Sequence, residues 1–163
     1  VYSYMFENEN TFARLQREGK EKVFDEKYES ALIEAASYLS KEYPNIISGD
    51  VLEEKKIEDI SPIDGKKIAT FQLSSKESVE KAVNLLHSGY RQWFAKGYLE
   101  RSRTLLKAYD LIREKKYLIA AIEAYENGKN RYEAVADVDE ALDFIKYYSL
   151  NLVKNEGFIR FTG

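Results

Sequence analysis

Residues 126–148 read ENGKNRYEAVADVDEALDFIKYY, a helix end followed by a long amphipathic helix. Gly128 can end the first helix, because glycine adopts the left-handed capping conformation without a steric penalty. The next helix is expected to begin near Asn130 and to continue to about Lys154. Apolar residues recur at helical spacing along it and predict a buried stripe, formed by Val135, Val138, Leu142, Ile145 and Leu152.

A second line of residues steps by four along a different face of this helix, namely Ala136, Glu140 and Phe144. Small, acidic and aromatic side chains in that order would suit a surface that faces a cavity. The alternative is that Glu140 is a solvated acid on an exposed helix face. Periodicity alone favours this alternative.

The composition is that of one soluble globular domain. The chain has 163 residues, of which 44% are hydrophobic and 33% charged, enough to bury a sizeable core. The net charge is −3 and the basic residues form no patch, so no nucleic-acid partner is expected. The apolar runs are too short to span a membrane and no signal-peptide pattern opens the chain. We therefore expect a cytoplasmic protein without a membrane partner.

The sequence contains no cysteine and one histidine, His87. These residues therefore offer no disulfide, no thiolate metal site and no cysteine nucleophile. A single histidine cannot build a histidine metal cluster, and His87 beside an apolar helix face is interpreted as structural. Neither a metal site nor a catalytic residue is predicted within these residues.

The first part of the chain is predicted to be helical and then to change period. Residues 1–20 predict an extended lead-in and a short helix that closes near Gly19. A helix over residues 25–41 follows, with Asp25 as its N-cap and Pro44 beyond its end. Short strands are expected within residues 45–52 around Gly49, and over residues 57–60 and 67–73. They predict surface β-hairpins.

Three further helices are predicted before the opening stretch. Ser74 or Ser75 caps the first, whose apolar face runs over residues 79–94. Gly97 separates it from a helix over residues 99–114, with four residues expected to be buried: Leu105, Leu106, Tyr109 and Ile112. Residues 117–127 form the next helix. The tail, residues 157–162, alternates like the start of a strand.

Several motifs resemble the N-terminal part of the aldehyde dehydrogenases. Residues 126–148 resemble that family's E-x-G-K, helix and D-F-x-x-Y-Y succession, and ISPIDGKKIATFQLSSKESVEKAV at residues 60–83 resembles its N-P-x-x-G-x-x-I-A-x-V motif. YPNIISGD at residues 43–50 and the run over residues 93–129 continue the likeness. It covers about residues 40–150. DVDEALDFIKYY is most similar to the 1-pyrroline-5-carboxylate (glutamate-γ-semialdehyde) dehydrogenase branch.

The resemblance implies an α/β fold for a complete enzyme, of which this segment would be mostly α-helical with short β-hairpins. Residues 1–42 would be an N-terminal helical extension, and residues 43–154 the N-terminal part of an NAD(P)-binding domain. Residues 155–163 would begin an oligomerisation hairpin. A homo-oligomer or a partner chain would supply the rest of the fold. Without it, the apolar faces over residues 86–94 and 135–152 are expected to lack partners.

The resemblance also implies the chemistry of a complete enzyme, the oxidation of L-glutamate γ-semialdehyde to glutamate in proline degradation with NAD or NADP. In this family a cysteine thiolate attacks the aldehyde, hydride passes to the nicotinamide and a glutamate activates water. The present sequence has no cysteine, no glycine-rich phosphate loop and no P-W-N-F segment. We therefore expect these 163 residues to be inactive alone and to bind no cofactor by themselves.

Glu140 matches the acidic position of D-x-x-E-A-x-D-F, which lines the aldehyde tunnel in the glutamate-semialdehyde branch. Ala136 and Phe144 would shape the same tunnel. Glu126 matches a position near a monovalent-cation site in some relatives, but an exposed acid near a helix end is the favoured interpretation, and Lys129 is interpreted as a solvated cation. The alternative function is a truncated, non-catalytic remnant that acts as a binding or scaffold domain.

Overall fold

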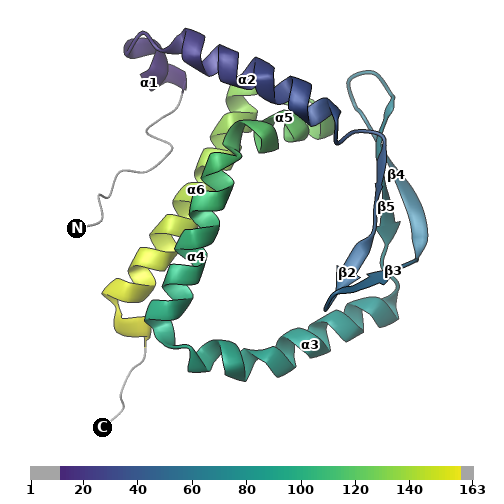
Figure 1. Cartoon of the computed structure of the whole chain (residues 1–163), viewed down its shortest axis with the longest axis vertical. Helices are drawn as coiled ribbons and strands as arrows, with labels where there is room; N and C mark the ends of the chain where they lie inside the picture. Colours follow the sequence, from purple (N-terminus) through teal and green to yellow (C-terminus); the bar gives the residue numbers. More distant parts are fainter. Residues whose placement is uncertain (1–11, 159–163) are drawn as a thin grey trace.

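The computed structural model describes residues 12–158 as an open frame of helices closed on one side by strands (Figure 1). One side consists of the long helices α4 (Gly97–Glu114) and α6 (Arg131–Lys154), which pack side by side. Helices α2 (Glu21–Ala36) and α5 (Lys116–Asn127) form an adjoining corner. Helix α3 (Lys76–Ala95) connects the strands back to α4.

The hydrophobic core lies where α2, α4, α5 and α6 meet. Phe24 and Tyr28 enter it from α2, and Leu118 enters it from α5. From α6, Val135, Val138 and Leu142 are buried, and Ile145 packs against them partly buried. The predicted stripe of α6 is therefore confirmed at these positions. The expectation that this stripe would lack a partner is wrong, because α4 and α5 cover it.

The helix boundaries around Gly128 are confirmed. Gly128 has a φ of 78° and ends α5, donating its N–H to the carbonyl of Ala124 at 3.0 Å. The side-chain oxygen of Asn130 then accepts hydrogen bonds from the N–H groups of Tyr132 and Glu133, at 3.0 and 3.1 Å, and caps α6. These contacts satisfy backbone groups that a helix end leaves unpaired.

The predicted N-terminal helix is shifted. Helix α2 begins at Glu21, so Asp25 lies inside it, and the prediction of Asp25 as N-cap is wrong. The helix ends at Ala36, and the predicted last residue of the helix, Lys41, instead begins strand β1 (Lys41–Tyr43). β1 pairs in parallel with the distant strand β5 (Lys67–Leu73). This long-range pairing overrides the local helical pattern.

The strands form two small sheets. The first has the order β1-β5-β4, and β4 (Lys55–Ile60) pairs antiparallel with β5. The second is the hairpin of β2 (Asn45–Ile47) and β3 (Asp50–Leu52), which turns at Ser48 and Gly49 with φ of 55° and 89°. Both predicted hairpins are confirmed, although β1 was not foreseen.

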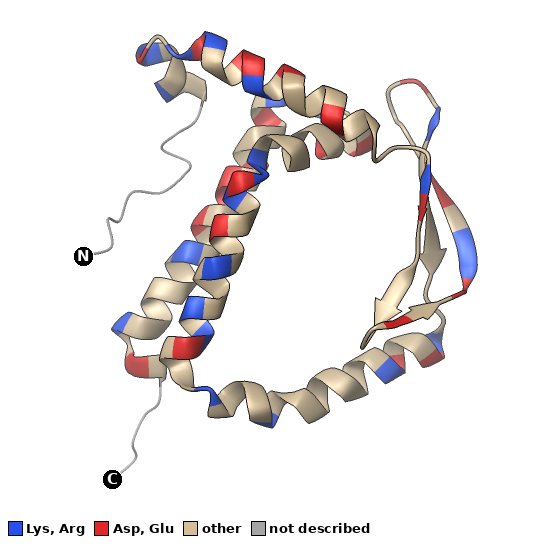
Figure 2. Ribbon diagram, in the orientation of Figure 1, with Lys and Arg blue, Asp and Glu red and all other residues tan. Residues whose placement is uncertain are grey.

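Helix α3 is amphipathic but leaves its apolar face uncovered. The hydroxyl oxygen of Ser75 accepts the N–H of Ser78 at 3.2 Å and caps the helix, as predicted. No residue of α3 is buried, and Leu86 is 76% exposed. Figure 2 shows a long run without charges along this helix. The expected unpartnered face over residues 86–94 is confirmed for the described part of the chain.

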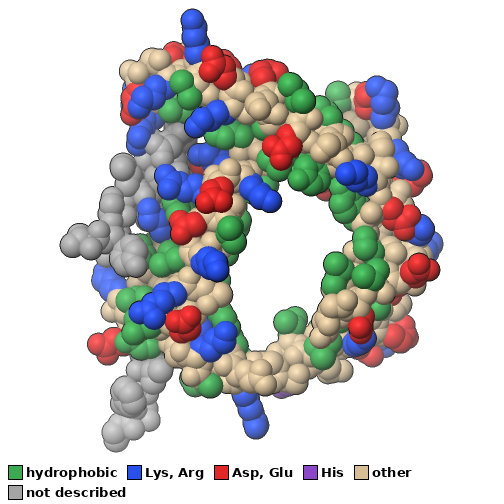
Figure 3. All heavy atoms as spheres, in the orientation of Figure 1, with side chains coloured by type: hydrophobic (Ala, Val, Ile, Leu, Met, Phe, Trp, Pro, Cys, Tyr) green, Lys and Arg blue, Asp and Glu red, His purple; other side chains and the backbone are tan. Residues whose placement is uncertain are grey.

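The frame encloses an opening that side chains do not fill (Figure 3). Hydrophobic side chains border part of it, on the strand side and near the α2–α5 corner. In α4, Tyr109 is buried as expected, and Leu106 and Ile112 are only half-buried. Leu105 is 39% exposed, so its predicted burial is wrong. An open frame buries fewer of its apolar side chains than a filled one.

The ends of the described chain are short helical turns. Helix α1 (Phe12–Arg17) followed by Gly19, with a φ of 67°, confirms the predicted short helix. At the other end, the 3-10 helix η2 (Glu156–Phe158) occupies part of the predicted strand, so that prediction is wrong at residues 157 and 158. The predicted lead-in and residues 159–162 lie outside the described residues. None of the helices within residues 12–158 has the length and apolarity that crossing a membrane requires.

Candidate functional site

The predicted face of α6 is partly open to solvent. Ala136 is half-buried, Glu140 is exposed, and Phe144 is 51% exposed. They occupy successive turns of one helix, so the structure brings them onto one face. The Phe144 ring stacks against that of Tyr148, with centroids 6.1 Å apart, which extends the face with a second aromatic side chain. We call this surface the Glu140 face. Its substrate-lining role stays a prediction.

A buried ion pair lies beside this face, at the residue that precedes Glu140. Asp139 is fully buried, and its Oδ1 accepts a hydrogen bond from Nζ of Lys116, the first residue of α5, at 2.8 Å. The Lys116 side chain is 12% exposed. Sequence reasoning missed this pair. The available signal was that Asp139 stands between Val138 and Leu142 in the buried stripe, where a carboxylate needs a partner.

An aromatic ring lies close to the buried pair. Nζ of Lys116 lies 5.7 Å from the centre of the Tyr117 ring. Burial raises the pKa of the Tyr117 hydroxyl above its usual range, and the negative charge of Asp139 raises it further. The pair therefore stands in a region of low polarity, where removing one partner leaves a costly buried charge.

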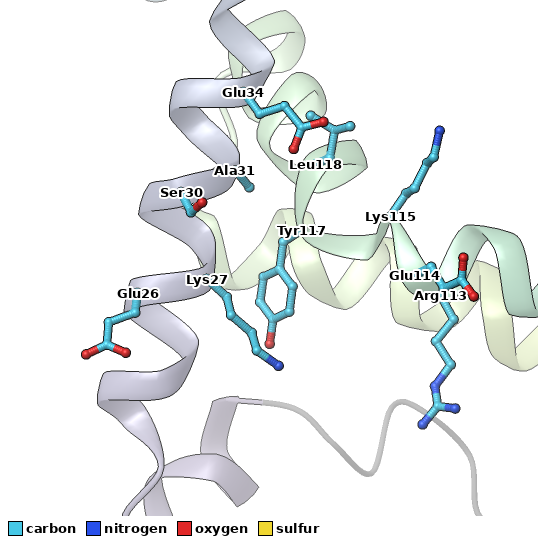
Figure 4. A pocket seen from close by; sticks show the side chains of 10 residues that line it. All are labelled: Glu26, Lys27, Ser30, Ala31, Glu34, Arg113, Glu114, Lys115, Tyr117 and Leu118. Carbon is cyan, nitrogen blue, oxygen red and sulfur yellow. The ribbon is translucent and has the colours of Figure 1, made fainter.

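A groove of about 500 Å³ runs between α2 and the α4–α5 corner. Figure 4 shows Lys27 and Tyr117 on its walls, and Nζ of Lys27 lies 5.7 Å from the Tyr117 ring centre. The charged lining residues are three cations and three acids, namely Lys27, Arg113, Lys115, Glu26, Glu34 and Glu114. A balanced lining of this kind selects neither anions nor cations. No predicted site residue lines the groove.

A smaller pocket of about 260 Å³ lies between the three-stranded sheet and α5. Glu126, at the end of α5, is exposed as expected and lines this pocket together with Asp59. The side chains of Tyr38, Tyr43 and Phe71 supply aromatic walls. Within residues 12–158, no group of three or more acidic or histidine side chains is arranged to hold a metal ion.

Lys129 and His87 lie apart from the Glu140 face. Lys129 forms ion pairs with Glu123, at 3.1 Å, and with Asp137, so it fastens the loop between α5 and α6. Lys129 is exposed, as predicted for a solvated cation, and the ion pairs were not foreseen. His87 is exposed on α3.

The sequence pattern of the aldehyde dehydrogenase family matches residues 50–159. The chain is 32% identical over 131 residues to 1-pyrroline-5-carboxylate dehydrogenase 2 of Bacillus subtilis (strain 168), covering 79% of this chain and 25% of that protein. It is 33% identical over 128 residues to the 1-pyrroline-5-carboxylate dehydrogenase of Staphylococcus aureus (strain MW2), covering 77% and 25%. The chain thus spans about a quarter of the length of these relatives.

Solved structures of related enzymes also resemble this chain. A Thermus 1-pyrroline-5-carboxylate dehydrogenase with bound NAD superposes with a TM-score of 0.77 at 28% identity, covering 85% of this chain and 28% of that chain. Proline utilization A from Bdellovibrio bacteriovorus superposes with a TM-score of 0.80 at 24% identity, covering 84% and 14%, and shows the fold alone. The predicted fold class, a mostly helical segment of an α/β fold, is confirmed. The chain belongs to the aldehyde dehydrogenase family.

Proposed function

We propose that this chain forms the N-terminal segment of an NAD(P)-dependent aldehyde dehydrogenase that oxidises L-glutamate γ-semialdehyde, the open form of 1-pyrroline-5-carboxylate, to glutamate. The observation that carries the proposal is the similarity to 1-pyrroline-5-carboxylate dehydrogenases over most of the chain. The family match over residues 50–159 includes the whole Glu140 face.

The Glu140 face supplies chemistry that suits this substrate. Glutamate semialdehyde carries an α-ammonium group, and a carboxylate such as that of Glu140 accepts charge-assisted hydrogen bonds from ammonium. Phe144 offers an apolar wall for the methylene chain, and Ala136 leaves room beside it. Covering the face with further polypeptide would lower the local dielectric constant and strengthen the attraction to Glu140.

The proposal assigns the nucleophile, the base and the cofactor-binding residues to polypeptide other than these 163 residues, which contain no cysteine. NAD or NADP would accept the hydride from the substrate. The eight glycines are widely separated along the sequence and form no glycine-rich phosphate loop. We therefore assign no residue of this chain to the cofactor.

The uncovered apolar surface supports the assignment of these catalytic and cofactor-binding parts to other polypeptide. Helix α3 exposes Val83, Leu86 and Tyr90, and the frame surrounds an opening (Figure 3). Exposed apolar surface of this extent is typical of an interface. The same enzyme or a partner chain would cover it, within a homo-oligomer in the cytoplasm. The uncovered face also argues against the alternative, a non-catalytic scaffold that folds alone.

Two measurements test the proposal. The intact masses of all polypeptides in the purified protein should reveal a cysteine-containing chain of several tens of kilodaltons, and that protein should oxidise glutamate semialdehyde with NAD or NADP. A single species of 18.9 kDa that is monomeric, melts cooperatively and exposes no apolar surface would instead support the scaffold.

The role of Glu140 has its own test. Glu140→Ala should lower kcat/KM for glutamate semialdehyde by about 10- to 100-fold and that for propanal by less than about threefold, because propanal has no ammonium group to hold. Glu114→Ala, which removes an exposed acid at the end of α4, is the matched control and should change neither value. Equal losses on both aldehydes would contradict the assignment.

A further inference from the structure

We propose that the buried Lys116–Asp139 ion pair is a positioning device that sets the rotation of α6 about its axis, and so the direction in which Glu140 faces. The inference rests on the proposed substrate role of Glu140. Neither Lys116 nor Asp139 touches the substrate in this proposal, and both act through Glu140.

Helix α6 is held against α5 by apolar contacts and by the directional hydrogen bond of the pair. Around the pair, α5 and α6 contribute apolar side chains to one core cluster, namely Leu118, Ala120, Ala121, Ala134, Val135, Val138 and Leu142. Such contacts are non-directional and tolerate small rotations of one helix against the other. The hydrogen bond from Nζ of Lys116 to Oδ1 of Asp139, at 2.8 Å, is directional. A buried polar pair of this kind is best suited to fixing register.

The buried pair lies next to Glu140 along α6. Asp139 directly precedes Glu140, so the two side chains leave the helix about 100° apart. A rotation of α6 by about 20° would move a side-chain end at about 5–6 Å from the axis by about 2 Å. A displacement of that size exceeds the variation in donor–acceptor distance that a hydrogen bond tolerates. Misplacement of a reacting group by about 1 Å can lower the rate about 100-fold.

Other polar contacts hold α6 at several points along its length. Asp137 pairs with Lys129, and Nζ of Lys146 lies 5.8 Å from the centre of the Tyr109 ring. Arg131, the first residue of the helix, pairs with the half-exposed acids Asp25 and Glu29. Near the other end, the hydroxyl of Ser102 donates to the carbonyl of Ser149 at 3.0 Å. Among these contacts, the Lys116–Asp139 pair is the one whose α6 residue directly precedes Glu140.

The experiment uses the complete enzyme that contains this segment and compares variants of matched chemistry. The Lys116→Met/Asp139→Leu double variant replaces the pair by apolar side chains of similar size and leaves no buried charge, so it is expected to fold even if single variants do not. Asp137→Asn is the control, because it removes a carboxylate from the same helix at an exposed ion pair with Lys129.

In the double variant, KM for glutamate semialdehyde should rise about tenfold or more while KM for propanal changes less than about twofold. Adding Glu140→Ala to the double variant should cause little further loss, because the pair acts through Glu140 and the effects of coupled residues do not multiply. Asp137→Asn should leave both KM values unchanged. Similar changes on both aldehydes, or losses that multiply, would overturn the proposal.

Crystal structures of the wild type and the double variant give a readout that does not depend on activity. A rotation of α6 against α5 in the double variant supports the device, and an unchanged helix refutes it. If the wild type does not oxidise glutamate semialdehyde, the proposed function is wrong, and these structures still decide whether the pair sets the position of α6.

Discussion

The guanidinium group of Arg131 lies 3.1 Å from the carboxylate of Asp25, which joins the first residue of α6 to α2. It also donates to Glu29, one turn further along α2, at 2.7 Å. Its central carbon lies 5.1 Å from the centre of the Tyr28 ring. Arg131 therefore connects an N-terminal helix that precedes the family-matched residues 50–159 to the helix that carries the Glu140 face.

Replacing Arg131 should loosen α2 without unfolding the chain. Arg131→Met removes two ion pairs whose carboxylates are 46% and 57% exposed. Exposed pairs contribute about 0.2–1 kcal/mol each, and the contact with the Tyr28 ring about 0.5–1 kcal/mol. We expect a loss of about 1–2 kcal/mol in the free energy of unfolding, measured by urea denaturation at low salt. The loss should shrink in 1 M salt, because salt screens the ion pairs.

Arg103→Met is the control for this prediction. Arg103 pairs only locally with Glu100, at 3.3 Å on the same helix, and its side chain is 73% exposed. Its replacement should cost less than about 0.5 kcal/mol. A loss as large as that of Arg131→Met would mean that the link between α2 and α6 contributes nothing specific.

Glu54 should make the junction of the strands with α3 sensitive to acid. Hydrogen bonds from the hydroxyl of Ser78 and the N–H of Ser75, with a further one from the Asn45 amide, lower the pKa of Glu54 from 4.5 to about 2. Since the folded pKa is depressed, the stabilisation is present above about pH 4.5 and is lost as the pH falls towards 2. The unfolding temperature should therefore fall over this range.

Glu54→Gln should flatten that part of the pH profile, because an amide does not titrate there. Glu53→Gln changes the neighbouring side chain and removes none of these hydrogen bonds, so its profile should follow the wild type. Measuring the unfolding temperature of the three proteins between pH 5 and pH 2 tests the assignment. A wild-type profile that Glu54→Gln leaves unaltered would refute it.

Two glycine-to-alanine substitutions should change the free energy of unfolding in opposite directions. Gly128 has a φ of 78°, and an added Cβ would meet Ile63 and Pro62 at 3.5 Å, an ordinary contact, so strain comes from the backbone alone. Gly128→Ala should cost about 1–2 kcal/mol. Gly89 lies within α3 with open space around it, and Gly89→Ala should stabilise by about 0.5–1 kcal/mol. Chemical denaturation of both variants would check the signs.

Removing one partner of the buried pair should lower the free energy of unfolding far more than replacing both partners. Asp139→Leu leaves Lys116 charged in a largely buried position and should cost about 3–5 kcal/mol. The Lys116→Met/Asp139→Leu double variant should recover most of this loss, because no charge remains buried. Denaturation of the wild type, the single and the double variant measures this coupling. A double variant no more stable than Asp139→Leu would mean that the pair contributes net stability that apolar packing cannot replace.

Several elements of the fold were predictable because their causes are local. Gly128 and Asn130 mark a helix end and a helix start through their own backbone and side-chain hydrogen bonds. Gly49 marks the β2–β3 hairpin in the same way. The shared face of Ala136, Glu140 and Phe144 follows from the helical period alone.

What only the tertiary structure decided involves residues far apart in the sequence. Strand β1 forms because β5 pairs with it, and Asp25 serves Arg131 across the helix interface instead of capping α2. Lys116 becomes the partner of Asp139 only when α5 folds back along α6. The helical period places Asp139 beside Val138 and Leu142, but it cannot show which cation meets the carboxylate. The identity of that partner depends on how two helices pack and not on either helix by itself.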